Sequence, residues 1–141
     1  MNKRIVLSIF VICLALFVEA QKPLILFGGQ DHDVFLGCLN CDNYASNSIW
    51  NAYNSYGSKY NSNSIWNAYG TYGSEYSTYS PFNENASYPP VIVDKEGGFY
   101  GYFTINTSHD KRADLNLAMT IYKYYDMIRD DVPAWYDKIF K

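Results

Sequence analysis

The sequence predicts an α+β domain that combines a small antiparallel sheet of hairpins, a tyrosine-rich insert of short helices and turns, and a C-terminal amphipathic helix. Three observations lead to this class: β-rich runs flank turn residues on two occasions, a sixteen-residue pattern recurs between them, and a helical apolar periodicity comes after them. The expected boundaries are 1–20 for a signal peptide and 21–141 for one small domain, with repeats over 42–88 and the helix over 108–131.

The first twenty residues have the organisation of a secretory signal. Lys3 and Arg4 precede an apolar run over 5–18, which is short for a membrane span. Small residues at Val18 and Ala20 predict cleavage before Gln21. An N-terminal anchor would need a longer run, and no later stretch is long and apolar enough to span a bilayer. The sequence therefore predicts an exported chain, periplasmic or extracellular.

Charge and composition narrow the function classes. The formal net charge is −3, so the chain lacks the basic patch that a nucleic-acid partner requires. Aromatic residues make up 18% of the chain, which favours an ordered protein. No glycine loop precedes a helix in a phosphate-binding pattern, and no cofactor is predicted.

The segment 21–41 predicts a hairpin that ends in a CxxC motif. The runs LILF (24–27) and DVFLG (33–37) lie on either side of the turn-forming GGQDH. In an exported chain, Cys38 and Cys41 are expected to form a disulfide. Two alternatives stay open: a redox pair, or a metal site that His32 would complete with the two cysteines.

The repeat places a serine before each of three related segments, IWNAYN, IWNAYG and PFNENA: Ser48, Ser64 and Ser80. A serine is a good helix N-cap, and Pro81 stands where the first helical residue would accept proline. Asn54 and Gly70 occupy the position expected to end each short helix in the left-handed conformation. The alternative is low-complexity disorder, against which the regular aromatic placement argues.

Aromatic and amide side chains recur in register within the repeat and suggest a ligand surface. Rings offer apolar area and amides offer directional hydrogen bonds, the combination suited to sugars or peptidoglycan. The alternative is that the rings form the core that the repeat otherwise lacks. The candidates for the ligand surface are Trp50, Asn51, Tyr56, Trp66, Asn67 and Tyr72.

The last third of the chain predicts a second hairpin and then the helix. Val91–Val93 and the run 99–104 flank DKEGG, a turn sequence. Beyond them, apolar residues return at helical spacing over 108–131, and Pro133 begins or redirects a final short segment. The two histidines and many serines show no nucleophile motif, so no catalytic residue is predicted.

Several motifs occur together in a fixed order: FLGCLNC, then SIWNAYGTYGSEYS and SPFN, then PPVIVD and GGFYGYFTIN. In this order the chain resembles a family of small uncharacterised bacterial exported proteins, which pairs a GCLNC motif with tandem SIWNxYGxYGSxY units. The resemblance spans about residues 35–106, with small departures at Asn54 and Tyr88. It implies no activity and no cofactor, and the helix lies outside it.

These observations favour a non-enzymatic exported module, structural or binding, at the cell envelope. Its expected partner is a cell-wall glycan or an envelope protein, contacted through the aromatic residues of the repeat. The alternative is an envelope redox or metal-binding protein that uses Cys38 and Cys41.

Overall fold

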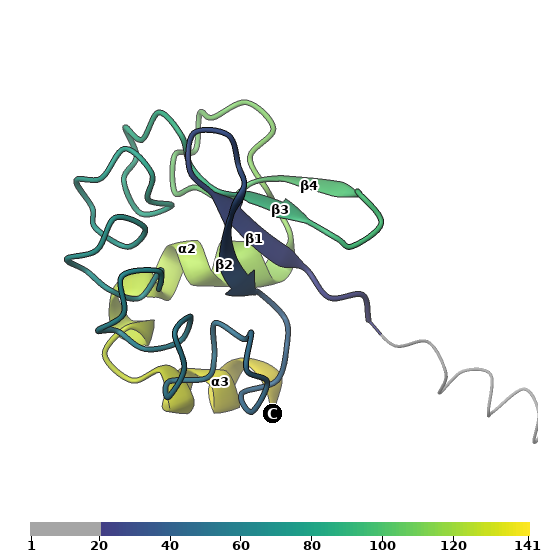
Figure 1. Cartoon of the computed structure of the whole chain (residues 1–141), viewed down its shortest axis with the longest axis vertical. Coiled ribbons are helices and arrows are strands. Elements are labelled where there is room, and N and C mark those ends of the chain that lie inside the picture. The colour runs from purple at the N-terminus through teal and green to yellow at the C-terminus, as the bar shows by residue number, and fades with distance from the viewer. Residues whose placement is uncertain (1–20) are drawn as a thin grey trace, which may run out of the picture.

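A computed structural model describes residues 21–141, and it confirms the α+β class (Figure 1). The signal peptide predicted for residues 1–20 lies outside the described residues. The elements are β1 (Ile25–Gly28), β2 (Val34–Cys38), β3 (Val91–Val93), β4 (Phe99–Tyr102), α2 (Asn116–Ile128) and α3 (Val132–Phe140). Residues 42–88, between β2 and β3, contain no helix or strand and wind along one side of the molecule (Figure 1).

The four strands form one antiparallel sheet in the order β2-β1-β3-β4. β1 joins the two halves of the sheet, because Ile25 pairs with Cys38 on one side and with Val93 on the other. Leu26 and Ile92, neighbours on β1 and β3, are fully buried. The 42–88 segment therefore leaves the sheet at the end of β2 and returns to it at the start of β3, with β1 between these two strands.

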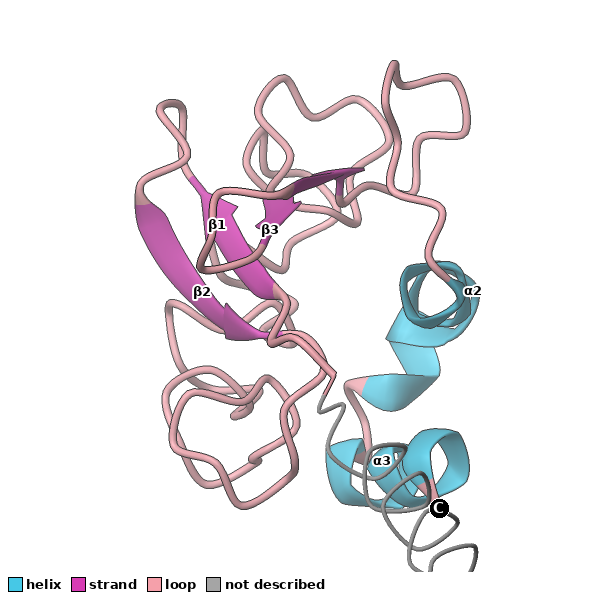
Figure 2. Ribbon diagram, turned by 90° about the vertical axis from the view of Figure 1, so that its right-hand side faces the viewer, coloured by secondary structure: helices cyan, strands magenta, loops and turns pink. Residues whose placement is uncertain are grey.

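Both helices lie on the same side of the sheet (Figure 2). α2 buries Ala118, Ile121, Tyr122 and Ile128. α3 was not predicted as a helix; it begins where the Asp131 carboxylate accepts a hydrogen bond from the Ala134 N–H, with proline in its first turn. Within residues 21–141 neither helix is long and apolar enough to cross a bilayer.

The predicted start of the long helix at residue 108 is wrong, because α2 begins only at Asn116. The residues before it pair with the edge of the sheet instead. Tyr102 of β4 donates its N–H to the Lys111 carbonyl at 2.9 Å and accepts from the Ala113 N–H at 2.8 Å. These bonds cover an edge strand that would otherwise leave its backbone groups unpaired.

The short helices predicted for residues 42–88 are absent, and a chain of β-turns takes their place; we call this segment the turn coil. The carbonyl of one residue accepts a hydrogen bond from the N–H of the residue three or, once in each winding, four positions later. The residue that donates this N–H then begins the next turn. Five such turns, four of three residues and one of four, lead from Ser48 to Ser64 through Asn51, Asn54, Ser58 and Asn61. The same steps lead from Ser64 to Ser80, so the sixteen-residue repeat is one winding of the coil.

Wherever a serine or an asparagine begins one of these turns between Ser48 and Ser80, its side chain also accepts a hydrogen bond from a backbone N–H within the turn. The Ser64 hydroxyl accepts from the Trp66 N–H at 3.1 Å, and the Asn67 amide oxygen accepts from the Tyr69 N–H at 3.1 Å. Serine and asparagine are suited to this role because their short side chains reach a backbone N–H two residues ahead. Gly73 serves a different purpose: a Cβ there would meet the Ile65 carbonyl at 2.6 Å and also collide with the Asn67 carbonyl.

Aromatic rings hold successive windings together from the inside. Trp50, Trp66 and Phe82 stand sixteen residues apart, with ring centroids separated by 5.6 and 6.1 Å. The Trp66 indole N–H donates to the Ile49 carbonyl at 2.6 Å, which ties its winding to the preceding one. The helices close this stack, since Tyr136 of α3 packs beside Trp50 and Tyr125 of α2 lies flat on Phe82 at 4.2 Å.

Candidate functional site

The outer surface of the turn coil carries a regular set of exposed tyrosines. Their exposed fractions lie between 83% and 98%, although tyrosine rings usually bury much of their area. They form two series at sixteen-residue intervals, so equivalent rings recur on successive windings. We call this set the outer tyrosines: Tyr44, Tyr53, Tyr60, Tyr69 and Tyr76.

Two of the residues predicted for a ligand surface lie in the interior of the molecule. Trp50 and Trp66 are buried, at 1% and 0% exposure, and belong to the core. Asn51 and Asn67 are engaged within the coil: the Asn67 amide nitrogen donates to the Asn61 carbonyl at 3.1 Å, and Asn51 donates to the Ala45 carbonyl at 3.3 Å. Each of these windings buries its tryptophan together with the isoleucine before it, Ile49 or Ile65.

Tyr56 and Tyr72, the remaining candidates, are half-buried against the first hairpin. The Tyr56 ring meets Phe35 of β2 edge-on at 4.9 Å. Tyr72 lies over Gly28, where an added Cβ would come within 3.2 Å of its ring. Burial raises the pKa of Tyr72 above the ordinary tyrosine value. These two side chains therefore attach the coil to the first hairpin of the sheet.

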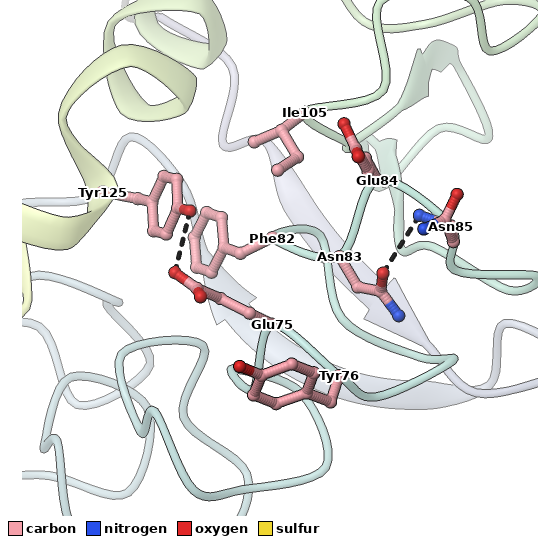
Figure 3. A pocket seen from close by; sticks show the side chains of 8 residues that line it. All are labelled: Glu75, Tyr76, Phe82, Asn83, Glu84, Asn85, Ile105 and Tyr125. Carbon is pink, nitrogen blue, oxygen red and sulfur yellow. Dashed lines mark hydrogen bonds between the residues drawn. The ribbon is translucent and has the colours of Figure 1, made fainter.

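A hollow of about 480 Å³ opens beside the last winding, next to Tyr76 (Figure 3). The stacked rings of Phe82 and Tyr125 form part of its wall. Polar groups surround the rings, among them the carboxylates of Glu75 and Glu84. Apolar rings bordered by a few convergent polar groups are the usual composition of a small-ligand site.

One hydrogen bond connects the coil to α2 across this hollow. The Tyr125 hydroxyl donates to the Glu75 carboxylate at 3.0 Å (Figure 3). Burial, reinforced by this bond, raises the pKa of Tyr125 to about 12. The hydroxyl is therefore protonated at neutral pH, and it holds Glu75 in place as an acceptor.

The cysteines form the predicted disulfide, Cys38–Cys41, at the end of β2. The bond is compatible with an oxidising compartment. It also leaves neither sulfur free as a thiolate ligand, so the predicted metal site with His32 loses two of its three ligands. His32 instead has its Nε2 at 3.1 Å from the Pro89 carbonyl oxygen. Among residues 21–141, no three histidine, cysteine or acidic side chains are grouped to hold a metal ion.

The outer tyrosines were missed because the sixteen-residue period was recognised without the shorter period inside it. Most turns have a serine or asparagine first, a variable residue second and an aromatic residue third, as in SEY and NAY. Five turns make up one winding, so the third residue of each successive turn faces a different side of the coil. That count separates Trp66, which faces inward, from Tyr69 and Tyr76, which face outward.

Comparison with protein-family models, with curated proteins and with solved structures finds no match to the chain. The resemblance of its motifs to small bacterial exported proteins stays a prediction.

Proposed function

We propose that the chain is an exported, non-enzymatic module that binds glycan chains at the cell envelope through the outer tyrosines. The observation that carries the proposal is the recurrence of these rings at more than 80% exposure on successive windings. Exposed aromatic area of this kind marks an interaction surface, because nothing in a monomer's own stability requires it. A regular row of rings suits a ligand that is itself repetitive, such as a polysaccharide.

The turn coil gives this surface a fixed geometry. The side chains of Tyr53 and Tyr69 are exposed, but the backbone of both residues is held in place. Their N–H groups donate hydrogen bonds to the amide oxygens of Asn51 and Asn67, both at 3.1 Å. The buried Trp50 and Trp66 hold the windings beneath them at a constant spacing. The backbone that carries the rings is therefore positioned before a ligand arrives, which reduces the backbone entropy lost on binding.

The proposal is tested by replacing two equivalent rings. Tyr53→Ser with Tyr69→Ser should weaken binding to insoluble peptidoglycan or to soluble polysaccharides about 10-fold or more, because each lost ring removes apolar contact area. Tyr53→Phe with Tyr69→Phe keeps the rings and should bind within about threefold of wild type. Both doubles should retain the wild-type melting temperature, since these side chains are exposed.

Pull-down and affinity electrophoresis against a panel of envelope glycans measure the effect. If the serine variant binds glycans as tightly as wild type, the outer tyrosines are not the binding surface. Retention of no glycan, with recovery of one envelope protein whose binding the serine variant loses, would assign the same surface to a protein partner instead.

A further inference from the structure

Arg129 is a buried cation without an acidic partner. It lies directly after the last residue of α2, and only 8% of its surface is exposed. Its Nη2 donates to the Gly73 carbonyl at 3.4 Å, while its buried Nε has no hydrogen-bond partner among the described residues. Within residues 21–141 it forms no ion pair.

The contacts that Arg129 does make compensate its charge only in part. The guanidinium carbon lies 5.6 Å from the Phe82 ring centre and 5.2 Å from that of Tyr125, within the range of cation–π attraction. The carboxyl end of α2 also favours a positive charge. A buried guanidinium nevertheless normally has a carboxylate or phosphate partner, because its five donors and its charge both lose water.

A hollow of about 430 Å³ opens at this arginine, on the side of the outer tyrosines. Tyr60 and Tyr69 line it together with Lys59, which adds a second positive charge. Asp130 also lines it and opposes an anion, but this carboxylate is exposed and its field is screened by water and salt. Glu75, two residues beyond Gly73, forms no ion pair with Arg129 and accepts a hydrogen bond from the Tyr125 hydroxyl.

We propose that this hollow is an anion site, and that it receives the carboxylate of an acidic sugar whose chain lies across Tyr60 and Tyr69. The identity of the sugar rests on the proposed function, whereas the anion site rests on Arg129 and Lys59. A carboxylate in the hollow supplies the counter-charge that the protein does not provide. The module is thereby selective for uronic-acid polymers over neutral ones.

The test uses two probes with the same sugar chain: an oligogalacturonate, which is charged, and its methyl ester, which is neutral and carries one extra methyl group on each sugar. Calorimetric titration of the folded protein should show that the acid binds about 10-fold more tightly than the ester, because hydrogen bonds to charged groups are the stronger ones. Arg129→Met should remove this preference, and Arg129→Lys should keep part of it. Raising the salt concentration should weaken binding of the acid and leave the ester unchanged.

Lys59→Glu is the second variant, since Lys59 is exposed and its replacement leaves the packing around Arg129 intact. It should lower affinity for the acid and spare the ester, even if Arg129→Met fails to fold. Equal affinity of wild type for acid and ester would overturn the proposal. So would an unchanged preference for the acid in folded Arg129→Met or, failing that variant, in Lys59→Glu.

A separate measurement distinguishes failure of the anion site from failure of the glycan proposal. If neither oligosaccharide binds, inorganic sulfate at millimolar concentration is compared with chloride at equal ionic strength. A sulfate-specific rise in melting temperature that Lys59→Glu or Arg129→Met loses would retain the anion site and reject a uronic-acid ligand. The same rise in wild type and both variants, or in none of them, would reject the site.

Discussion

Asparagine and serine side chains supply, residue by residue, the hydrogen bonds that helices and sheets provide elsewhere. In the turn coil the Asn54 amide oxygen accepts from the Tyr56 and Gly57 N–H groups, both at 2.9 Å. The Asn83 amide nitrogen returns to the Ser77 carbonyl at 2.9 Å. Local side-chain bonds of this kind compete with regular secondary structure, and here they replace it.

Ser64→Ala tests this role at a buried position. The Ser64 hydroxyl is fully buried and accepts from the Trp66 N–H. Its loss leaves that N–H without a partner or water, so we expect a decrease of about 1–3 kcal/mol in the free energy of unfolding. Urea denaturation followed by tryptophan fluorescence measures the change.

Ser74→Ala is the matched control, because the Ser74 hydroxyl makes the same bond to the Tyr76 N–H at 3.1 Å in an exposed setting. Water can replace the lost acceptor there, and the expected cost is below about 0.5 kcal/mol. Equal costs at both positions would show that burial of the turn bond has no importance.

Sequence reasoning located these residues but assigned them to the wrong element. A serine whose oxygen serves a backbone N–H a few residues ahead is a common feature of helix caps and of isolated turns. The two cases differ in the residues that come after the serine. At Ser64 the next asparagine, Asn67, begins another turn after three residues, so no helical ladder of bonds can start. Regular spacing of turn-forming residues was the neglected signal.

At the scale of single elements, the β3–β4 hairpin depends on one carboxylate. The Tyr100 hydroxyl donates to Asp94 at 2.6 Å, and the Gly98 and Glu96 N–H groups donate to its other oxygen at 2.9 and 2.8 Å. These bonds, that of Tyr100 foremost, lower the pKa of Asp94 below its ordinary value. The charged carboxylate is therefore the form that closes the hairpin turn.

A lowered pKa makes this contribution dependent on pH. It is fully present above the unfolded pKa of Asp94, near 3.8, and is lost as the pH falls through the lower folded value. Tyr100→Phe removes the largest cause, so the variant should lose less stability than wild type between about pH 5 and pH 2. Urea unfolding across that range measures the difference.

Tyr102→Phe, on the same strand, is the control and should keep the wild-type pH profile, since the Asp94 carboxylate bonds to Tyr100 and not to Tyr102. An unchanged acid sensitivity in Tyr100→Phe would mean that the backbone N–H groups alone hold the carboxylate.

Helix α2 shows why element boundaries were harder to predict than element types. Its apolar periodicity is local and was recognised, whereas its start depends on pairing between residues 111–113 and β4. That pairing joins a loop to a strand edge and has no periodic signature. In this pairing the backbone groups of Lys111 and Ala113 form hydrogen bonds with Tyr102. These residues cannot also form a helix, because a helix would use the same backbone groups.

For the molecule as a whole, three parts contribute to one core. The sheet provides Leu26 and Ile92, the turn coil provides its inner rings, and α2 closes the core with Ile121. We expect the coil not to be stable by itself. The inner ring of each winding, Trp50, Trp66 or Phe82, is covered in part by the next winding or by a helix.

The disulfide sits where the sheet passes into the turn coil, and its burial bears on the alternative of a redox function. Cys38 is fully buried, and its backbone bonds to the coil through the Asn47 carbonyl and the Ile49 N–H. A redox-active pair presents an accessible sulfur to its partner thiol. Cys38 does not meet this requirement and the half-buried Cys41 meets it only in part, so we expect reduction of the bond to be much slower in the folded protein than in the unfolded one.

Mass measurement after exposure to dithiothreitol tests this at the scale of the whole molecule. In native buffer the bond should persist for hours, and it should be reduced rapidly once urea unfolds the protein. Replacing both cysteines by alanine should lower the free energy of unfolding by about 2 kcal/mol, the entropic value for so short a loop. Rapid, reversible reduction of the folded protein without loss of structure would contradict the structural role and favour the redox alternative. In that case the coil would have to open at Cys38, and amide exchange at Ile49 would accelerate together with reduction.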